Sequence, residues 1–216
     1  MTLRPLTHGL RLKLLVLAAA ALVASPSSIS APVSPRVSPA GANRPAKARY
    51  PDPRYRPPVN VSELRAIAGQ VAKASGREIR WRLVLGKNPG PLAKINGNLN
   101  DCTITLHPIG AQKLPPNTWA FILGHEFAHL VENLGNHSQN NPSNELKADI
   151  AGARYAMAAG YRIEAFLGWV LTEPNQHTKS HGSPRDRVSK VAAHFGIPQN
   201  VMQAEAKRYS AYRAKH

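Results

Sequence analysis

The sequence predicts an α+β fold, with a small mixed or antiparallel sheet towards the N-terminal side and a mainly helical C-terminal half. Residues 79–106 contain short runs in which apolar and polar residues alternate, a pattern typical of strands. After residue 116, apolar residues recur at helical spacing between prolines and glycines. The 216 residues, 43% of them hydrophobic, suffice for one globular domain with its own core, which excludes a chain disordered throughout.

The first expected element is a helix over residues 61–75, where apolar residues recur every three to four positions. Alternation then predicts strands at residues 79–85, 93–95 and 102–106. Asn96-Gly97 is expected to form the turn between the last two strands, because this dipeptide favours tight hairpins.

Start and stop signals locate the remaining helices. Asn117 or Thr118 is expected to cap the first of them, directly after two prolines. Ser183 and Pro184 form a strong helix start, with a capping side chain followed by proline at the first helical position. The expected helices cover residues 117–133, 142–159, 163–171 and 184–196, and a last helix follows Pro198.

The first 25 residues are typical of an export leader. Arg4, Arg11 and Lys13 precede an apolar run at residues 14–24, which is shorter than the ~20 residues that span a bilayer. We interpret the segment as a signal peptide, and we expect a periplasmic or secreted protein. The alternative is an uncleaved N-terminal membrane anchor. The single cysteine, Cys102, excludes a disulfide framework.

Residues 26–58 predict an extended basic linker, because prolines recur throughout this segment and cannot donate backbone hydrogen bonds. The domain is then residues 59–216. The formal net charge is +16, and more than half of the excess lies before residue 59 and after residue 196. These ends can contact an anionic envelope polymer or a membrane surface, although ordinary solvated charge is the simpler alternative. Basic and aromatic residues do not alternate, so no specific nucleic acid is expected as a partner.

The segment His125-Glu126-Phe127-Ala128-His129 carries the strongest chemical signal. On a helix, residues i and i+4 share a face, so both imidazoles can bind one metal ion. Glu126 lies beside that face and can accept a proton from a metal-bound water. The surrounding residues are apolar, which predicts a buried helix, and buried histidines and glutamate need partners that a cation supplies. The alternative is a surface helix with an ion pair.

Two residues are candidates for a third metal ligand, since a catalytic zinc site usually has three protein ligands and one open position. His137 follows in the next loop, but the metzincin pattern requires a glycine and a histidine where this chain has Glu132 and Gly135. Glu145 fits better, because Asp149 lies one helical turn further on and can bond an imidazole N–H. The alternative for both carboxylates is a solvated helix face.

The motif H-E-x-x-H followed by Glu145-Leu146-Lys147-Ala148-Asp149, of the form E-x-x-A-D, resembles the gluzincin metallopeptidases. The likeness is greatest to the HtpX and CAAX-prenyl-endopeptidase family. The segment 180–188 also resembles that family's S-x-H-P-x-x-x-x-R-[IV] motif, although Gly182 follows the histidine and Ser180 lies one residue too close. The resemblance covers residues 93–188 and implies a zincin-like active-site helix in a soluble, exported relative.

The resemblance also implies a role for each matched residue. His125, His129 and Glu145 would bind Zn²⁺, and Glu126 would act as general base and then as general acid. Asp149 would support an imidazole, while His181 would donate to the oxyanion and Arg187 would hold a carboxylate or the loop near the site. Asn96 would belong to the edge strand that binds the substrate backbone.

The expected activity is therefore zinc-dependent hydrolysis of peptide bonds in envelope or extracellular proteins. One alternative is a regulator of the gluzincin type, which would act in the cytoplasm. Another is an envelope binding module with a structural zinc and basic polymer-binding ends, in which four ligands would close the metal site.

Overall fold

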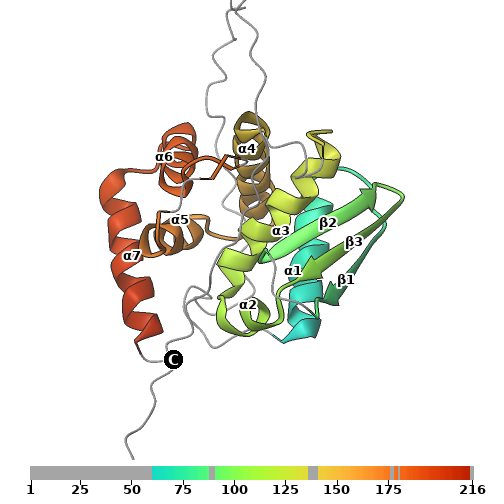
Figure 1. The fold of residues 1–216 in the computed structure, drawn as a ribbon, viewed down its shortest axis with the longest axis horizontal. Coiled ribbons are helices and arrows are strands. Elements are labelled where there is room, and N and C mark those ends of the chain that lie inside the picture. The colour runs from blue at the N-terminus through green and yellow to red at the C-terminus, as the bar shows by residue number, and fades with distance from the viewer. Residues whose placement is uncertain (1–59, 88–90, 136–140, 176–177, 180, 215–216) are drawn as a thin grey trace, which may run out of the picture.

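The computed structural model describes residues 60–87, 91–135, 141–175, 178–179 and 181–214. They form a small sheet on one side of a group of helices (Figure 1), which confirms the predicted α+β class. The expected leader, residues 1–25, and the expected linker, residues 26–58, lie outside the described residues.

The sheet is mixed and has the strand order β1-β3-β2. β1 (Trp81–Leu85) pairs with β3 (Asp101–Leu106) in parallel, and β2 (Ala93–Asn98) pairs with β3 in antiparallel orientation. One face of the sheet contributes Leu83, Ile95 and Ile104 to the core, each of them buried. β2 is therefore an edge of the described sheet, and it is the strand that lies against the central helix.

The turn between β2 and β3 lies later in the chain than the Asn96-Gly97 signal predicts, and that prediction is wrong. Asn96 and Gly97 both belong to β2, and the chain reverses at Leu99-Asn100. The side chain of Asn98 explains the shift, because its Oδ1 accepts from the backbone N–H of Asn100 at 2.8 Å. Gly97 has a φ of +113°, and a Cβ there would lie 2.9 Å from the Cα of Cys102.

Cys102 lies on β3 with its side chain in the core, 1% exposed. Burial, together with the neighbouring carboxylate of Asp101, raises the pKa of its thiol to about 11, against a smaller opposing effect of Arg82. Cys102 therefore packs as a small apolar residue.

The helices begin with α1 (Val61–Ala74), which is capped by Asn60. A short helix, α2 (Pro108–Lys113), follows the sheet and was not expected, because six residues are too few for a periodic pattern. α3 (Pro116–Val131) starts one residue before the expected position. The predicted cap at Asn117 or Thr118 is wrong, because both residues lie inside α3 and the Oδ1 of Asn117 accepts from the backbone N–H of Arg162 instead.

The C-terminal half consists of helices joined by short segments. Side-chain caps at Asn141 and Ser183 confirm two of the expected helix starts, with Ser183 accepting from the backbone N–H of Asp186 at 3.2 Å. The helices are α4 (Pro142–Ala158), α5 (Glu164–Thr172), α6 (Pro184–His194) and α7 (Gln199–Arg213).

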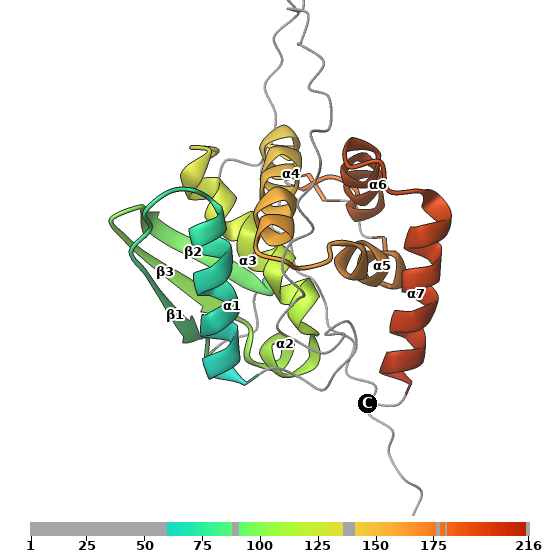
Figure 2. The ribbon, with the colours of Figure 1, turned by 180° about the vertical axis from the view of Figure 1, so that it is seen from behind.

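α3 and α4 pack against each other (Figure 2). Their backbones touch at Gly124 of α3 and Gly152 of α4. A Cβ at Gly124 would lie 2.5 Å from the carbonyl oxygen of Gly152, and a Cβ at Gly152 would lie 2.6 Å from the carbonyl carbon of Gly124. Only glycine permits this approach. The contact brings the first half of α4 beside the His125–His129 segment of α3.

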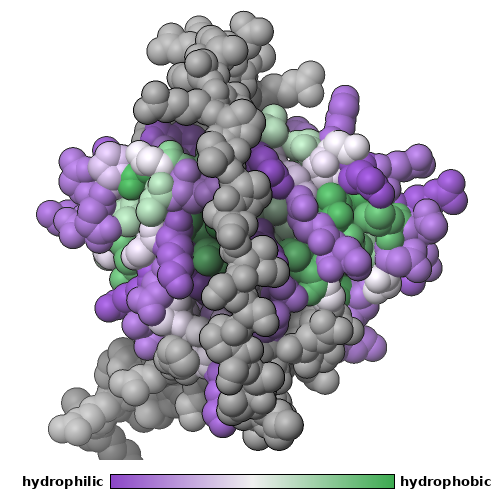
Figure 3. Space-filling model, turned by 90° about the horizontal axis from the view of Figure 1, so that it is seen from above, coloured by the Kyte–Doolittle hydropathy of each residue, from purple (hydrophilic) through white to green (hydrophobic). Residues whose placement is uncertain are grey.

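The described surface is mainly hydrophilic over the face seen in Figure 3. The large apolar side chains exposed among the described residues are Val84 and Leu85, at 42% and 41%. Within the described part of the chain, no helix combines the length and the apolar character that crossing a membrane requires.

Candidate metal centre

α3 positions two histidines and a glutamate in the interior of the protein. Every residue from Pro116 to His129 is buried, as its apolar composition predicts. His125 and His129 lie one turn apart on the same face, and their Nε2 atoms are 3.2 Å from each other. Both rings therefore direct one nitrogen towards a common point.

α4 adds a carboxylate to this point. Glu145 Oε2 lies 3.4 Å from His125 Nε2, and Glu145 Oε1 lies 3.6 Å from His129 Nε2. Ligands of a tetrahedral ion at ~2.0–2.1 Å stand ~3.3–3.4 Å apart, which is close to these separations. His125, His129 and Glu145 lie close enough to hold a metal ion.

The Nδ1 atom of each histidine, which faces away from the common point, forms a hydrogen bond with an oxygen of the protein. His129 Nδ1 lies 3.0 Å from the carbonyl oxygen of Gly135, and His125 Nδ1 lies 2.9 Å from Asp149 Oδ1. A carbonyl oxygen can only accept, so Nδ1 of His129 carries the proton and its Nε2 presents a lone pair. When both rings are neutral and protonated on Nδ1, their Nε2 lone pairs face each other at 3.2 Å, a separation that a shared proton or a bound cation can bridge.

Arg187 of α6 holds the carboxylates behind the histidines. Its Nε donates to Asp149 Oδ2 at 2.6 Å and its Nη2 to Asp149 Oδ1 at 2.7 Å, a bidentate pair. The same Nη2 lies 3.7 Å from Glu145 Oε2. Burial acts to raise the pKa of Asp149, but the charge of Arg187 and the bond to His125 hold it below its ordinary value.

The electrostatics of the site favour positive charge at the histidines. Burial alone would lower the pKa of His125, but the hydrogen bonds to Asp149 and Glu145, together with the charge of Asp149, raise it to about 9. The carboxylates of Asp149 and Glu145, which favour a protonated His125, would also favour a metal cation bound between the two rings. The site therefore attracts either a proton or a metal ion.

Glu126 lies beside the histidines and faces the sheet. Its Oε2 accepts a hydrogen bond of 2.9 Å from the backbone N–H of Ile95 on β2, and the side chain is 3% exposed. The side chain of Glu126 is thus held between α3 and the edge strand β2.

His181 lies on a short loop that ends at the start of α6. A two-residue bridge between Thr178 and Gly182 closes the loop, and the Oγ1 of Thr178 accepts from the backbone N–H of His181. His181 Nε2 lies 3.4 Å from Glu145 Oε2, with the side chain 30% exposed. Gly182 has a φ of +69°, a value that proline cannot adopt.

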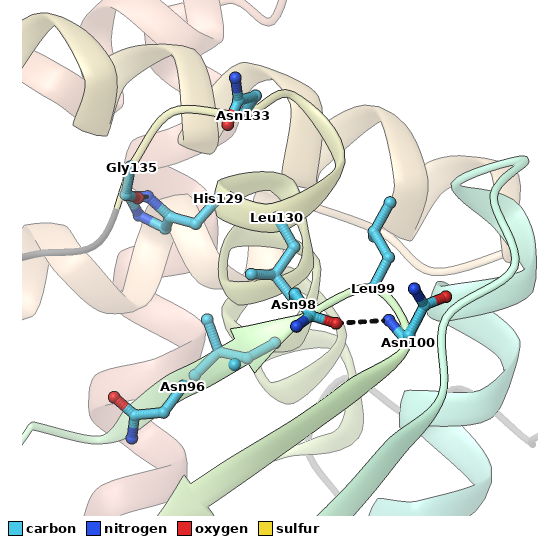
Figure 4. A pocket seen from close by; sticks show the side chains of 10 residues that line it. Asn96, Asn98, Leu99, Asn100, His129, Leu130, Asn133 and Gly135 are labelled. Carbon is cyan, nitrogen blue, oxygen red and sulfur yellow. Dashed lines mark hydrogen bonds between the residues drawn. The ribbon is translucent and has the colours of Figure 1, made fainter.

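A cavity of about 490 Å³ opens beside the histidines, between β2 and the end of α3 (Figure 4). Asn96 lies at its rim on the sheet side and Leu130 on the helix side. The lining residues are Ile95, Asn96, Gly97, Asn98, Leu99, Asn100, His129, Leu130, Asn133 and Gly135. Apart from His129, none of these side chains is titratable.

The structure thus brings together His125, Glu126, His129, Glu145, Asp149, His181 and Arg187, and it locates Asn96 on the neighbouring strand. His137, the rejected third ligand, lies outside the described residues. Sequence reasoning missed the carbonyl of Gly135 and the N–H of Ile95, because backbone groups leave no signal in residue identity. The glycine at position 135 is itself a partial signal, since glycine is common where a chain leaves a helix, and Gly135 has a φ of +76°.

Comparisons of the chain with protein-family models, curated proteins and solved structures find no match. The chemical class of the site therefore rests on its geometry: two imidazoles and one carboxylate that can hold a metal ion, with a second carboxylate beside them.

Proposed function

We propose that this protein is a zinc-dependent endopeptidase of the gluzincin type, similar to the HtpX and CAAX-prenyl-endopeptidase family. The convergence of His125, His129 and Glu145 carries the proposal, because three protein ligands with an adjacent carboxylate are the donor set of hydrolytic zinc sites. Two imidazoles and one carboxylate suit Zn²⁺ better than Ca²⁺ or Mg²⁺, which prefer oxygen ligands throughout.

The proposed chemistry uses Glu126 as the group that moves the proton. Zinc, when bound, lowers the pKa of a coordinated water and polarises a carbonyl. Glu126 takes the proton of the attacking water and then gives it to the leaving amine, so that its carboxylate is restored at the end of the cycle. His181, which is partly exposed, would donate a hydrogen bond to the oxyanion of the tetrahedral intermediate.

The substrate that suits this site is a peptide in an extended conformation. β2 is an edge of the described sheet, and a peptide can add to such an edge through backbone hydrogen bonds. The neighbouring cavity is large enough for a substrate side chain. Its uncharged lining, which includes Asn96 and Leu130, favours a neutral side chain, because a charged one would lose its hydration without finding an opposite charge.

The features of residues 1–25 that are typical of an export leader, together with the basic ends, favour a location for the proposed activity. We propose that the protein acts in the periplasm or after secretion, on envelope or extracellular proteins, and that its basic ends contact anionic polymer or lipid. Fractionation of cells followed by detection of the processed chain tests this location, and a full-length chain in the cytoplasm would contradict it.

The activity is tested by digestion of casein or a peptide library with zinc-loaded protein. Substitution of Glu126 by Gln should lower kcat by a factor on the order of 10² to 10⁴ and leave zinc content unchanged, since this residue moves the proton without binding the ion. Glu132→Gln is a matched control, because Glu132 lies at the C-terminal end of the same helix and accepts hydrogen bonds from Arg154 and Tyr155 rather than from β2. Equal turnover by wild type and Glu126→Gln would contradict the proposal.

A further inference from the structure

The backbone N–H of Ile95 points away from the sheet and towards α3. Leu92, which precedes β2, accepts a hydrogen bond from His107, so the backbone of the even-numbered residues from 92 onwards faces β3. Alternation then directs the N–H groups of Ile95 and Gly97 outward. The Ile95 N–H meets Glu126 Oε2 at 2.9 Å, in agreement with this register.

This hydrogen bond joins two buried groups, since Ile95 is 4% and Glu126 is 3% exposed. A bond from an amide to a carboxylate is charge-assisted, and it is stronger away from water. Fixing one carboxylate oxygen also fixes the direction of the other, because the last torsion of the glutamate can no longer turn. The strand therefore sets the orientation of a side chain that another element carries.

We propose that the backbone amide of Ile95 positions the Glu126 carboxylate for proton transfer, which rests on the proposed function of the site. The general base is thus held by one outward-facing amide of β2, and the backbone of Gly97, the next outward-facing residue, stays available to an added peptide. Small displacements of a reacting group are costly, with ~1 Å accounting for about 10² in rate. Loss of the amide should therefore lower kcat and have little effect on KM or on zinc binding.

Amide hydrogen exchange tests the bond without any activity. In ¹⁵N-labelled wild type, the Ile95 amide should exchange at least about tenfold more slowly than that of Gly97, the next outward-facing amide of the same strand. Glu126→Ala should bring the two amides to similar rates, and Glu126→Gln, which keeps an oxygen acceptor, should retain part of the protection. Amides of β3 should keep their rates in both variants. Fast exchange at Ile95 in wild type, or no response to Glu126→Ala, would overturn the proposal.

Kinetics of two variants test the consequence for catalysis. Ile95→Pro removes the N–H and places a ring carbon where the amide hydrogen meets Glu126, so the carboxylate loses its donor and is displaced. Ile95→Ala shortens the same buried side chain and keeps the N–H. In zinc-loaded protein, kcat of Ile95→Pro should fall at least about tenfold below that of Ile95→Ala, with similar KM and zinc content. Equal kcat in the two variants would overturn the positioning role.

The two tests separate this proposal from the proposed function. A wild-type protein that binds zinc and cleaves no peptide would contradict the endopeptidase, whereas the exchange rates of Ile95 would still decide whether the amide holds Glu126. In a Glu126→Ala background, Ile95→Pro and Ile95→Ala should have the same residual rate, and a persistent difference would show that the amide acts on another group.

Discussion

Four side chains converge on the carboxylate of Glu145. His125 and His181 lie 3.4 Å from it, His129 lies 3.6 Å away and Arg187 lies 3.7 Å away. A buried carboxylate in this position serves as a ligand only while its neighbours hold it in place. The guanidinium of Arg187 contacts Glu145, which is a candidate ligand. It also pairs with Asp149, which bonds the candidate ligand His125.

Substitution of Glu145 should therefore reduce the affinity for zinc more than substitution of Asp149. Glu145→Ala removes a candidate ligand and should weaken zinc binding by more than 100-fold. Asp149→Asn weakens the support of His125 and the pairing with Arg187, and it should cost about 10- to 100-fold. Competition with a chelating dye measures both. Glu132→Ala is the control on a neighbouring carboxylate, and zinc binding by Glu145→Ala equal to that of wild type would contradict the assigned ligand set.

His181 distinguishes an open metal site from a closed one. Its Nε2 lies near the candidate ligands, so the same residue could act on the substrate or complete the coordination of the ion. For the proposed peptidase, His181→Ala should lower kcat by a factor on the order of 10² and leave zinc affinity within about threefold. A large loss of zinc affinity in this variant would indicate four ligands and favour the binding module with a structural zinc.

At this scale, the sequence predicted the residues with characteristic side chains and missed the backbone groups. The spacing of His125 and His129 predicts a shared face, and Asp149 follows Glu145 by one helical turn, so both pairs can be found without a structure. The donors and acceptors at Ile95 and Gly135 depend on where the chain turns. Which imidazole Asp149 contacts depends on the crossing of two helices, and spacing alone does not determine it.

The crossing of α3 and α4 is the element-level feature that assembles the site. Gly124 and Gly152 allow the two backbones to touch, and this brings Glu145 and Asp149 of α4 to the histidines of α3. The separation of the helices thus sets the distances among the candidate ligands.

Gly152→Ala should force these helices apart. The added Cβ meets backbone atoms of Gly124 and His125, which cannot rotate away, so we expect a loss of about 1–3 kcal/mol in the free energy of unfolding and weaker zinc binding. Gly69→Ala is the matched control, because a Cβ there meets only the ring of Trp81 at 3.7 Å. It should leave stability equal or higher. Denaturant titration measures both, and an equal effect of the two substitutions would contradict the packing argument.

Elements with strong boundary signals were predicted well, and those with competing signals were not. Ser183 and Pro184 predicted the start of α6 correctly, because cap and proline agree. The β2–β3 turn was misplaced because Asn96-Gly97 is the stronger local signal, whereas the side chain of Asn98 bonds the backbone of the actual turn. α2 lacks a periodic pattern because it is a single short helix.

The candidate centre depends on several elements of the fold, because its residues come from β2, α3, α4 and α6 and from His181 just before α6. The fold class followed from the pattern of alternating and helical segments, but the parallel pairing of β1 with β3 did not, since it joins strands that are not adjacent in sequence. The pairing of distant strands depends on how their apolar side chains pack in the core. The same apolar residues can pack in several strand orders, so the sequence alone does not determine the order.

Zinc should stabilise the entire domain, because only the folded chain brings α3 and α4 together. At a free zinc concentration about 1,000 times Kd, the expected gain is ~4 kcal/mol, and Tm should rise by about 10 °C over that of chelator-treated protein. Scanning calorimetry measures the shift. Glu145→Ala should show little of it, and a wild-type Tm that does not respond to zinc would contradict a folded metal site.

The burial of the Cys102 thiol on β3 has a consequence for its redox chemistry. With a thiol pKa of about 11, only about one molecule in several thousand carries the reactive anion at pH 7.5. Attack on oxidised glutathione or on a second copy of the chain would then be very slow, because the anion is the nucleophile in such exchange. The domain can therefore enter an oxidising compartment without covalent cross-linking through Cys102.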